Sequence, residues 1–170
     1  MRTRYAGQAL PLLALMLPML TLFVVVVIEL ANLWLDIARL EDALQQATRS
    51  AVQQVEYAVL ARNGQALRGN RSCQAVTIKA PGQCAAIVQV AHQFLVANLQ
   101  AARPVGTDPA ALAATTRWTV LPQGGSCAGI TVSTPLLCAE LQLSLRGLFG
   151  LGEVHPRIRA ADTIDRLSQP

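Results

Sequence analysis

Four cysteines are the residues whose type and spacing point most directly to chemistry. They begin and end two copies of one pattern, CQAVTIKAPGQC and CAGITVSTPLLC, each predicted to be a short strand and a proline-led bend. No C-x-x-C spacing and no cysteine–histidine cluster occurs, so disulfides are favoured over a metal or redox site. Four cysteines allow three connectivities. The equal intervals favour Cys73–Cys84 and Cys127–Cys138, with a crossed pairing or free thiols as the alternatives.

The other chemistry-bearing residues form no catalytic constellation. His92 and His155 stand alone in separate expected elements, and each is interpreted as a satisfied or exposed histidine. Ser126 lacks the G-x-S-x-G context of a nucleophile, and GLFGLG at 147–152 lacks the strand–loop–helix setting of a dinucleotide loop. We expect a protein that is not an enzyme and has no cofactor, metal ion or small-molecule substrate. The alternative, an anchored ligand-binding or hydrolytic domain, needs convergent polar groups in a pocket.

An apolar run of 19 residues precedes the cysteines and organises the chain. The run at 10–28, LPLLALMLPMLTLFVVVVI, carries no charge, and a helix of this length crosses a hydrocarbon core of roughly 30 Å. Tyr5 and Trp34 flank it at the spacing of the two membrane interfaces. We therefore expect residues 1–9 to form a short cytoplasmic head and residues 10–29 a single transmembrane helix in the lipid bilayer.

The charges around the run predict its orientation. Arg2 and Arg4 precede it whereas Glu29 and Asp36 follow it, so the positive-inside rule places the N-terminus in the cytoplasm and the bulk outside. An oxidising outer compartment agrees with disulfides. A cleavable signal peptide is the alternative, disfavoured because the apolar run is long and no small-x-small site follows it. Glu29 is expected either to contact a partner helix or to reach interfacial water.

The helix is expected to continue beyond the membrane as an amphipathic segment over 30–63. Apolar residues recur in steps of three and four, and polar residues occupy the other face. Asn63-Gly64 supplies a C-terminal stop, so one continuous helix is predicted from about residue 8 to 62. Alanines at the later positions favour close packing on a sheet or helix over a coiled-coil seam. The expected stripe comprises Leu30, Leu33, Ile37, Leu40, Leu44, Ala47, Ala51, Val55 and Ala58.

The remaining segment, 64–170, is predicted to be one extracytoplasmic α+β domain stapled by the disulfides. Apolar spacing predicts a helix over 87–102, and other patterns predict strands at 117–122, 140–146 and 157–164. Such a small antiparallel sheet needs a helix over its apolar face, and the alanine stripe is the expected cover. The inward residues expected in the second strand are Leu141, Leu143 and Leu145.

The net charge of +4 does not predict nucleic-acid binding. The 14 basic residues are scattered along the chain without a run, and aromatic residues are few. Nucleic-acid binders instead cluster their cations on one face beside stacking aromatics. We interpret the positive charge as solvated surface.

The N-terminal motifs resemble those of the TadE/TadG-like pseudopilins, membrane proteins of the tight-adherence (Tad/Flp) pilus machinery. The resemblance rests on GQALPLLALMLP, IELANL and LEDALQQATRSAVQ, and more loosely on the C-terminal ELQLSLRGLFGLGEVHPRIRAADT. It implies a pilin-like fold and a minor structural or assembly subunit of a Tad/Flp-type pilus or related complex in the bacterial inner membrane. Its implied partners are other membrane-protein subunits. The positions that match the family pattern are Gly7, Gln8, Pro18, Glu29, Ala43, Ala47 and Ala51.

One position departs from that pattern. Many family members have a glutamate five residues after the glycine of the processing site, here Gly7-Gln8, whereas this chain has Leu12. We therefore expect an unprocessed N-terminus, as in TadG-like members. The alternative function is an accessory single-span subunit that binds and stabilises a different multi-subunit membrane complex.

Overall fold

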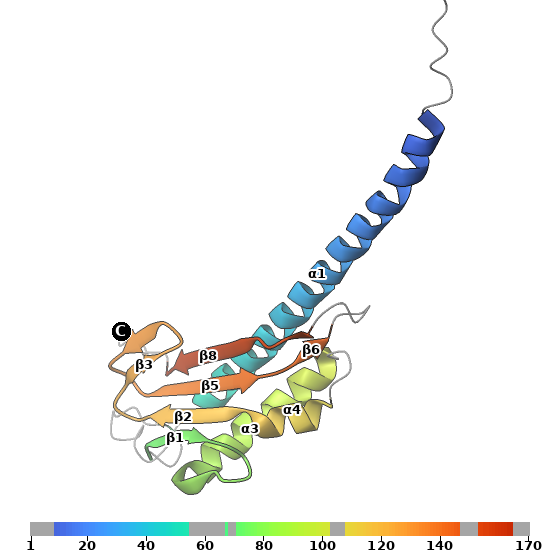
Figure 1. Cartoon of the computed structure of the whole chain (residues 1–170). Coiled ribbons are helices and arrows are strands. Elements are labelled where there is room, and N and C mark those ends of the chain that lie inside the picture. Colours follow the sequence, from blue (N-terminus) through green and yellow to red (C-terminus); the bar gives the residue numbers. More distant parts are fainter. Residues whose placement is uncertain (1–8, 55–66, 68–70, 103–107, 147–152, 165–170) are drawn as a thin grey trace, which may run out of the picture.

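A long helix, α1 (Ala9–Val52), leads into a domain in which helices cover one face of a small antiparallel sheet (Figure 1). The computed structural model describes residues 9–54, 67, 71–102, 108–146 and 153–164. The predicted long apolar N-terminal helix and small antiparallel sheet are confirmed. The other elements, in chain order, are β1 (Cys73–Val76), η1 (Gly82–Cys84), α3 (Ala85–Ala102), α4 (Pro109–Thr115), β2 (Arg117–Leu121), β3 (Gly125–Cys127), β4 (Ile130–Val132), β5 (Leu136–Gln142), β6 (Leu145–Arg146), β7 (Glu153–Val154) and β8 (Arg157–Thr163).

The composition of α1 explains its length. It contains no glycine, and Pro18 is accommodated within the helix although it removes one backbone donor. Thr21 donates its hydroxyl to the carbonyl of Leu17 at 2.8 Å, which satisfies the one hydrogen-bonding side chain of the apolar run. The predicted continuity of the helix past the expected membrane face is confirmed as far as Val52.

The end of α1 differs from the prediction, because the helix ends at Val52 rather than near residue 62. Gln54 donates its backbone N–H to the carbonyl of Ala51 at 3.0 Å, a bond three residues back that tightens the final turn. Val52 is still buried in this final turn, whereas Gln53 beside it is exposed. The last residues named in the prediction lie outside the described residues; they are Val55, Ala58, Asn63 and Gly64.

The buried side of α1 packs against α3, β5 and β8. Leu30, the first residue of the predicted stripe, is exposed, and Leu33 and Ile37 are only partly buried. Full burial begins one turn later and includes three alanines, whose small side chains let the helix approach the sheet closely. The fully buried positions are Leu40, Ala43, Leu44, Ala47, Thr48, Ala51 and Val52.

The sheet has the order β1-β2-β5-β8, and each neighbouring pair is antiparallel. The predicted strands at 117–122 and 157–164 are confirmed as β2 and β8. Side chains alternate along each strand, and every second residue faces the helices. The residues of these strands in the helix-side core are Trp118, Val120, Leu137, Ala139, Leu141, Ile158 and Ala160.

The predicted strand at 140–146 is wrong as a single element. β5 ends at Gln142, where its partner β8 begins at Arg157, and β6 pairs with β7 instead. A strand needs a neighbour for its backbone groups, and this partner exchange is not visible in a local pattern. The predicted inward side chains Leu141, Leu143 and Leu145 are nevertheless buried.

The second layer contains two further helices. α3 confirms the helix predicted over 87–102, and one of its faces is buried through Val88, Ala91, Leu95 and Leu99, with Ala102 partly buried. α4 occupies a segment for which the sequence pattern predicted neither a helix nor a strand. Asp108 caps it by accepting hydrogen bonds from the backbone N–H groups of Ala110 and Ala111 at 3.3 and 3.1 Å, and Pro109 is its first residue.

Replacing Ala47 by leucine tests the close contact between α1 and the sheet. Ala47 is fully buried, so three added carbons have no space, and we expect the variant to be less stable by about 1–3 kcal/mol. The matched control is Ala38→Leu, the same change at an exposed position of the same helix. Denaturation of the full chain in detergent micelles measures both variants. Equal stability of the two would contradict this packing.

Candidate functional site

The structure joins Cys73 to Cys84 and Cys127 to Cys138, the pairing that the equal intervals predict. The paired Cα atoms lie 6.4 Å and 6.2 Å apart, and none of these four cysteines is free. The first disulfide ties the edge strand β1 to the 3-10 turn that leads into α3. The second ties β3 to the central strand β5.

The two copies of the cysteine pattern nevertheless fold differently. The first is the predicted strand and bend, closed by a bridge between Thr77 and Ala80. In the second, β3 and β4 form a hairpin around Ala128-Gly129, where both residues have positive φ, as a type I′ turn requires. The chain then continues into β5. The predicted strand and bend is therefore present in the second copy, as β4 and the bend at Ser133 and Thr134, but the pattern did not predict the added strand β3.

The second disulfide holds the β3–β4 hairpin over the outer face of the sheet, the face turned away from the helices. Leu136 and Cys138 alternate with the core residues Leu137 and Ala139, so they lie on this outer face, yet both are buried. The outer face is thus covered along the first part of β5. Farther along, where Glu140 lies, it carries charged side chains instead.

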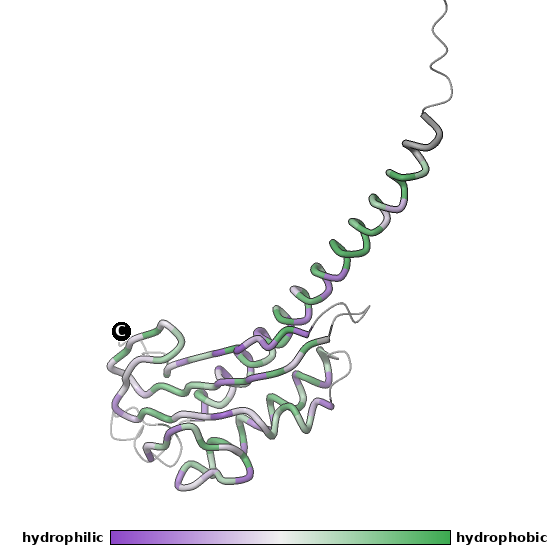
Figure 2. The backbone as a smooth tube through the Cα atoms, viewed as in Figure 1, coloured by the Kyte–Doolittle hydropathy of each residue, from purple (hydrophilic) through white to green (hydrophobic). Residues whose placement is uncertain are grey.

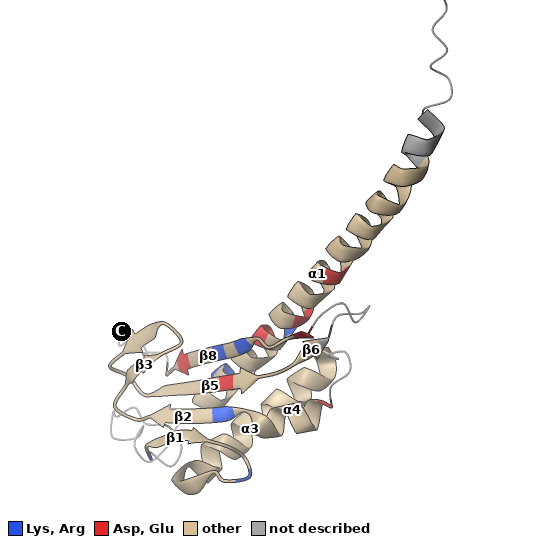
Figure 3. Cartoon of the chain, viewed as in Figure 1, with Lys and Arg blue, Asp and Glu red and all other residues tan. Residues whose placement is uncertain are grey.

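Charged residues form a row across the outer face, seen as blue and red bands on β2, β5 and β8 in Figure 3, and we call Arg117, Glu140, Arg157 and Arg159 the arginine row. The sheet register places Arg117 of β2 and Arg159 of β8 opposite Glu140 of β5, one on each side. Arg157 Nη2 lies 2.5 Å from one carboxylate oxygen of Glu140, and Arg159 Nε lies 3.2 Å from the other. Within the described residues Arg117 has no ion-pair partner, so the row has an excess of positive charge.

The arginines keep Glu140 ionised. The hydrogen bond from Arg157 lowers the pKa of Glu140 below its usual value; burial opposes this shift, and the charges of Arg157 and Arg159 reinforce it. The carboxylate balances only one of three guanidinium charges. Both paired arginines are about half-exposed, which leaves their other N–H groups available to a further acceptor.

A cavity of about 320 Å³ lies over the arginine row and reaches the β3–β4 hairpin. Two of its hydroxyl groups are already used: Thr119 Oγ1 accepts from the N–H of Ala75, and Ser126 Oγ accepts from Thr131. Guanidinium groups bind carboxylates and other planar anions through paired hydrogen bonds. The cavity is therefore suited to holding an anionic group.

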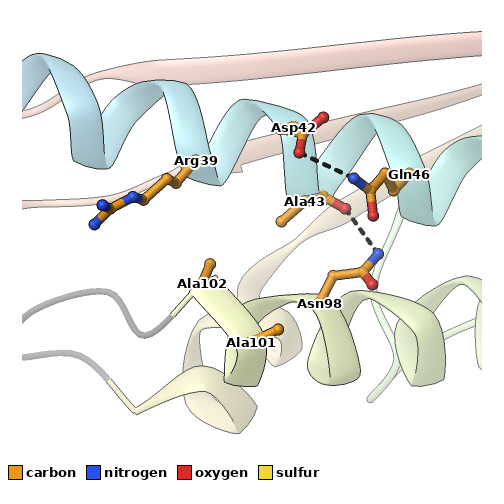
Figure 4. A pocket seen from close by; sticks show the side chains of 7 residues that line it. All are labelled: Arg39, Asp42, Ala43, Gln46, Asn98, Ala101 and Ala102. Carbon is orange, nitrogen blue, oxygen red and sulfur yellow. Dashed lines mark hydrogen bonds between the residues drawn. The ribbon is translucent and has the colours of Figure 1, made fainter.

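A second cavity, of about 480 Å³, lies between α1 and α3 (Figure 4). Its polar groups bond to the chain itself: Gln46 donates to Asp42 at 2.9 Å, and Asn98 donates to the backbone carbonyl of Ala43 at 3.3 Å. The second bond crosses from one helix to the other. We interpret this cavity as part of the helix packing, with Arg39 at its rim.

Two described segments are long and apolar enough to cross a membrane, Ala14–Val52 and Gly82–Ala102. The second lies in the domain and contributes six buried residues to its core, Cys84, Ile87, Val88, Ala91, Leu95 and Leu99. The first is hydrophobic and exposed over the part of α1 that extends away from the domain (Figures 1 and 2). α1 can therefore serve as a single membrane span.

The predicted interface residues have different environments. Trp34 is 71% exposed on α1, as a residue that meets lipid headgroups requires. Glu29 is only 5% exposed and is engaged within the chain, although Ile28 and Leu30 beside it are about half-exposed. The remaining predictions, for Tyr5, Gly7 and Gln8, lie outside the described residues.

The two histidines lie in separate parts of the domain, His92 on α3 and His155 after β7. His92 is partly buried on α3, which lowers its pKa, and its Nε2 has no hydrogen-bond partner among the described residues. It is thus neither fully exposed nor satisfied, contrary to the sequence interpretation. His155 is exposed. Across the described ranges no three histidine, cysteine, aspartate or glutamate side chains gather as metal ligands would.

Sequence reasoning missed the arginine row, because the basic residues are scattered along the chain. Arg157 and Arg159 stand two positions apart in a strand pattern, which places both on one face. The inward positions predicted for Leu141 and Leu143 likewise imply that Glu140 points to the other face. Their meeting depends on the register of β2, β5 and β8, and a single sequence does not reveal that register.

Known proteins do not add to this description. No protein-family model, no curated protein and no solved structure matches the chain. What the protein does must therefore be inferred from the exposed apolar helix, the stapled domain and the charged row on its sheet.

The variant Arg157→Gln tests the electrostatics of the row. It removes the largest cause of the lowered Glu140 pKa, so an NMR titration should show this pKa rising toward 4.5. Because the folded pKa lies below the unfolded one, Glu140 adds stability above about pH 4.5, and this stability is lost as the pH falls through the folded pKa. The variant should therefore lose less stability on acidification than the original chain.

The matched control is Arg39→Gln, which removes an arginine paired with Asp36 on α1 at 3.6 Å. This change should leave the Glu140 pKa unaltered. A Glu140 pKa that is the same in Arg157→Gln and in the original chain would contradict the assignment.

Proposed function

We propose that the chain is a membrane-anchored structural and assembly subunit, a minor pseudopilin-like component of a Tad/Flp-type pilus or related envelope complex. The observation that carries the proposal is the division of α1. Its first half is apolar and exposed, and its second half is packed into the domain without an intervening break. Such a helix couples the position of the domain to that of the membrane span, as a pilin-like subunit requires.

The residues that resemble the TadE/TadG-like family support this reading. Ala43, Ala47 and Ala51 are all buried, which gives the alanine-rich part of the family pattern a physical role in joining helix and domain. Pro18 lies in the exposed part of α1, where transmembrane helices tolerate proline. The pattern therefore corresponds to an anchor followed by a packing surface.

The charge distribution supports an orientation with the domain outside the bacterial inner membrane. Arg2 and Arg4 precede the apolar run, and the first carboxylate follows it at Glu29. Two disulfides are typical of a domain in an oxidising compartment.

Assembly would use two kinds of contact. Within the bilayer, the exposed apolar side chains of α1 would pack laterally against helices of other subunits through van der Waals contacts. Outside it, the domain would dock on neighbouring subunits through polar and charged groups. The protein would then act by holding other subunits in place rather than by catalysing a reaction.

The anchor is tested by Phe23→Asp together with native mass spectrometry of the complexes extracted from bacterial membranes. An aspartate near the centre of a span costs about 2.5–3.5 kcal/mol, so we expect less of the variant in membranes. The matched control is Phe94→Asp, which changes an exposed phenylalanine of α3 in the domain and should be retained.

The original chain is expected to copurify with pilus-platform proteins and pilin. Copurification with an unrelated multi-subunit membrane assembly would contradict the pilus assignment while leaving the anchor intact. Equal membrane retention of Phe23→Asp and Phe94→Asp would instead contradict the anchor.

A further inference from the structure

The last strand, β8, forms an edge of the sheet, and its backbone has a defined open side. Leu143 donates its N–H to Pro156, and Ile164 donates to Pro135, both at 3.4 Å. In an antiparallel ladder, hydrogen-bonded pairs occur at every second residue, so the even-numbered residues of β8 bond to β5. The N–H and C=O groups that point to the open side belong to Arg157, Arg159, Ala161 and Thr163.

The β8 edge has fewer features that prevent pairing with a further strand than the opposite edge of the sheet has. At the opposite edge, β1 has four residues, an irregular register and a disulfide at Cys73, and such features discourage further strand pairing. β8 has seven residues in regular register. Its Thr163 N–H is occupied by the side chain of Asp162 at 2.8 Å, whereas the open groups of Arg159 and Ala161 form no hydrogen bond in the described part of the chain.

A cavity of about 460 Å³ lies along this edge and makes it a slot with two walls. One wall is the polar side of α1, and the other is the turn of the β3–β4 hairpin with Ala128 and Ile130. The floor is β8 itself from Arg159 to Asp162. A polypeptide lying in the slot would run beside the open backbone groups.

The two faces of the sheet beside the slot differ in charge. On the outer face, Arg157 and Arg159 carry the excess positive charge of the arginine row. On the helix side, the lining includes Glu41, Asp42 and Asp162, of which Asp162 lies 3.8 Å from Arg49. Successive side chains of an added strand would point alternately to these two faces, so acidic residues suit one face and basic residues the other.

We propose that the open edge of β8 binds an extended segment of a partner polypeptide by strand addition, and that this segment alternates acidic and basic residues. Its acidic side chains face Arg157 and Arg159, and its basic side chains face α1. A second copy of β8 fits poorly, because pairing two such strands brings arginines together on one face. The inference rests on the geometry of β8 and does not require the pilus assignment.

The test is hydrogen exchange of the full disulfide-bonded chain in detergent micelles, with the capped peptide EKEKEKEK as the probe. In the free chain the Arg159 and Ala161 amides should exchange quickly, and the peptide should slow them by about tenfold or more. The Ile158 and Ala160 amides, which bond to β5, should be protected in both states. The matched control peptide, EEEEKKKK, has the same composition without the alternation and should protect neither open amide.

Two variants at one residue distinguish the contribution of the backbone hydrogen bond to peptide binding from that of the charged side chains. Ala161→Pro removes the open N–H and leaves the bonds to β5 in place, so it should weaken binding of EKEKEKEK by roughly three- to tenfold. Ala161→Ser keeps the N–H and should bind as the original chain does. Unchanged near-ultraviolet circular dichroism of both variants shows that the domain is folded.

Several results would overturn the proposal. Failure of EKEKEKEK to protect the two amides would do so. Binding of the peptide while both amides still exchange quickly would also do so, because it would indicate a charge contact without strand addition. Equal affinity of the chain for EEEEKKKK and EKEKEKEK would also contradict strand addition. So would equal affinity of Ala161→Pro and Ala161→Ser for EKEKEKEK. Concentration-dependent protection without peptide would show that a second copy occupies the edge.

Discussion

The close contact between α1 and the sheet is the interaction on which the rest of the structure depends. A four-stranded sheet with one apolar face is not stable alone in water, and α1 and α3 cover that face. Ala43, Ala47 and Ala51 allow α1 to approach closely. The same helix continues into the exposed apolar segment without a break, so the element that completes the core is also the candidate membrane anchor. Folding of the domain and its attachment to the bilayer therefore depend on the same helix.

The outer face of the sheet is not covered by helices. Part of it is covered by the β3–β4 hairpin, which Cys127–Cys138 holds against β5, and part carries the arginine row around Glu140. The hairpin and α1 stand on either side of β8, and the open edge lies between them. The outer face thus combines a covalently fixed cover with charged groups that are free to meet another molecule. This division is consistent with a protein that functions by binding other molecules.

The sequence was informative where structure depends on local periodicity. The stripe of α1, the helix at 87–102 and the cysteine pairing all follow from spacing along the chain. The helix end at Val52 did not, because no glycine or proline stands at Val52 or in the two residues that follow. The short helix α4 was missed although Asp108 and Pro109 are ordinary start signals. The arginine row depends on strand register, which joins residues far apart in sequence and leaves no local pattern.

The central claim is that one unbroken helix joins the membrane span to the domain, and a distance measurement tests it most directly. Spin labels on cysteines introduced at Val24 and Gln45, two exposed positions of α1, would be measured in lipid bilayers by pulsed electron resonance. With a rise of 1.5 Å per residue, a continuous helix separates the two backbone positions by about 32 Å. The account predicts one narrow distribution around this distance. A broad distribution, or a second population at shorter distance, would show a hinge between anchor and domain and contradict it.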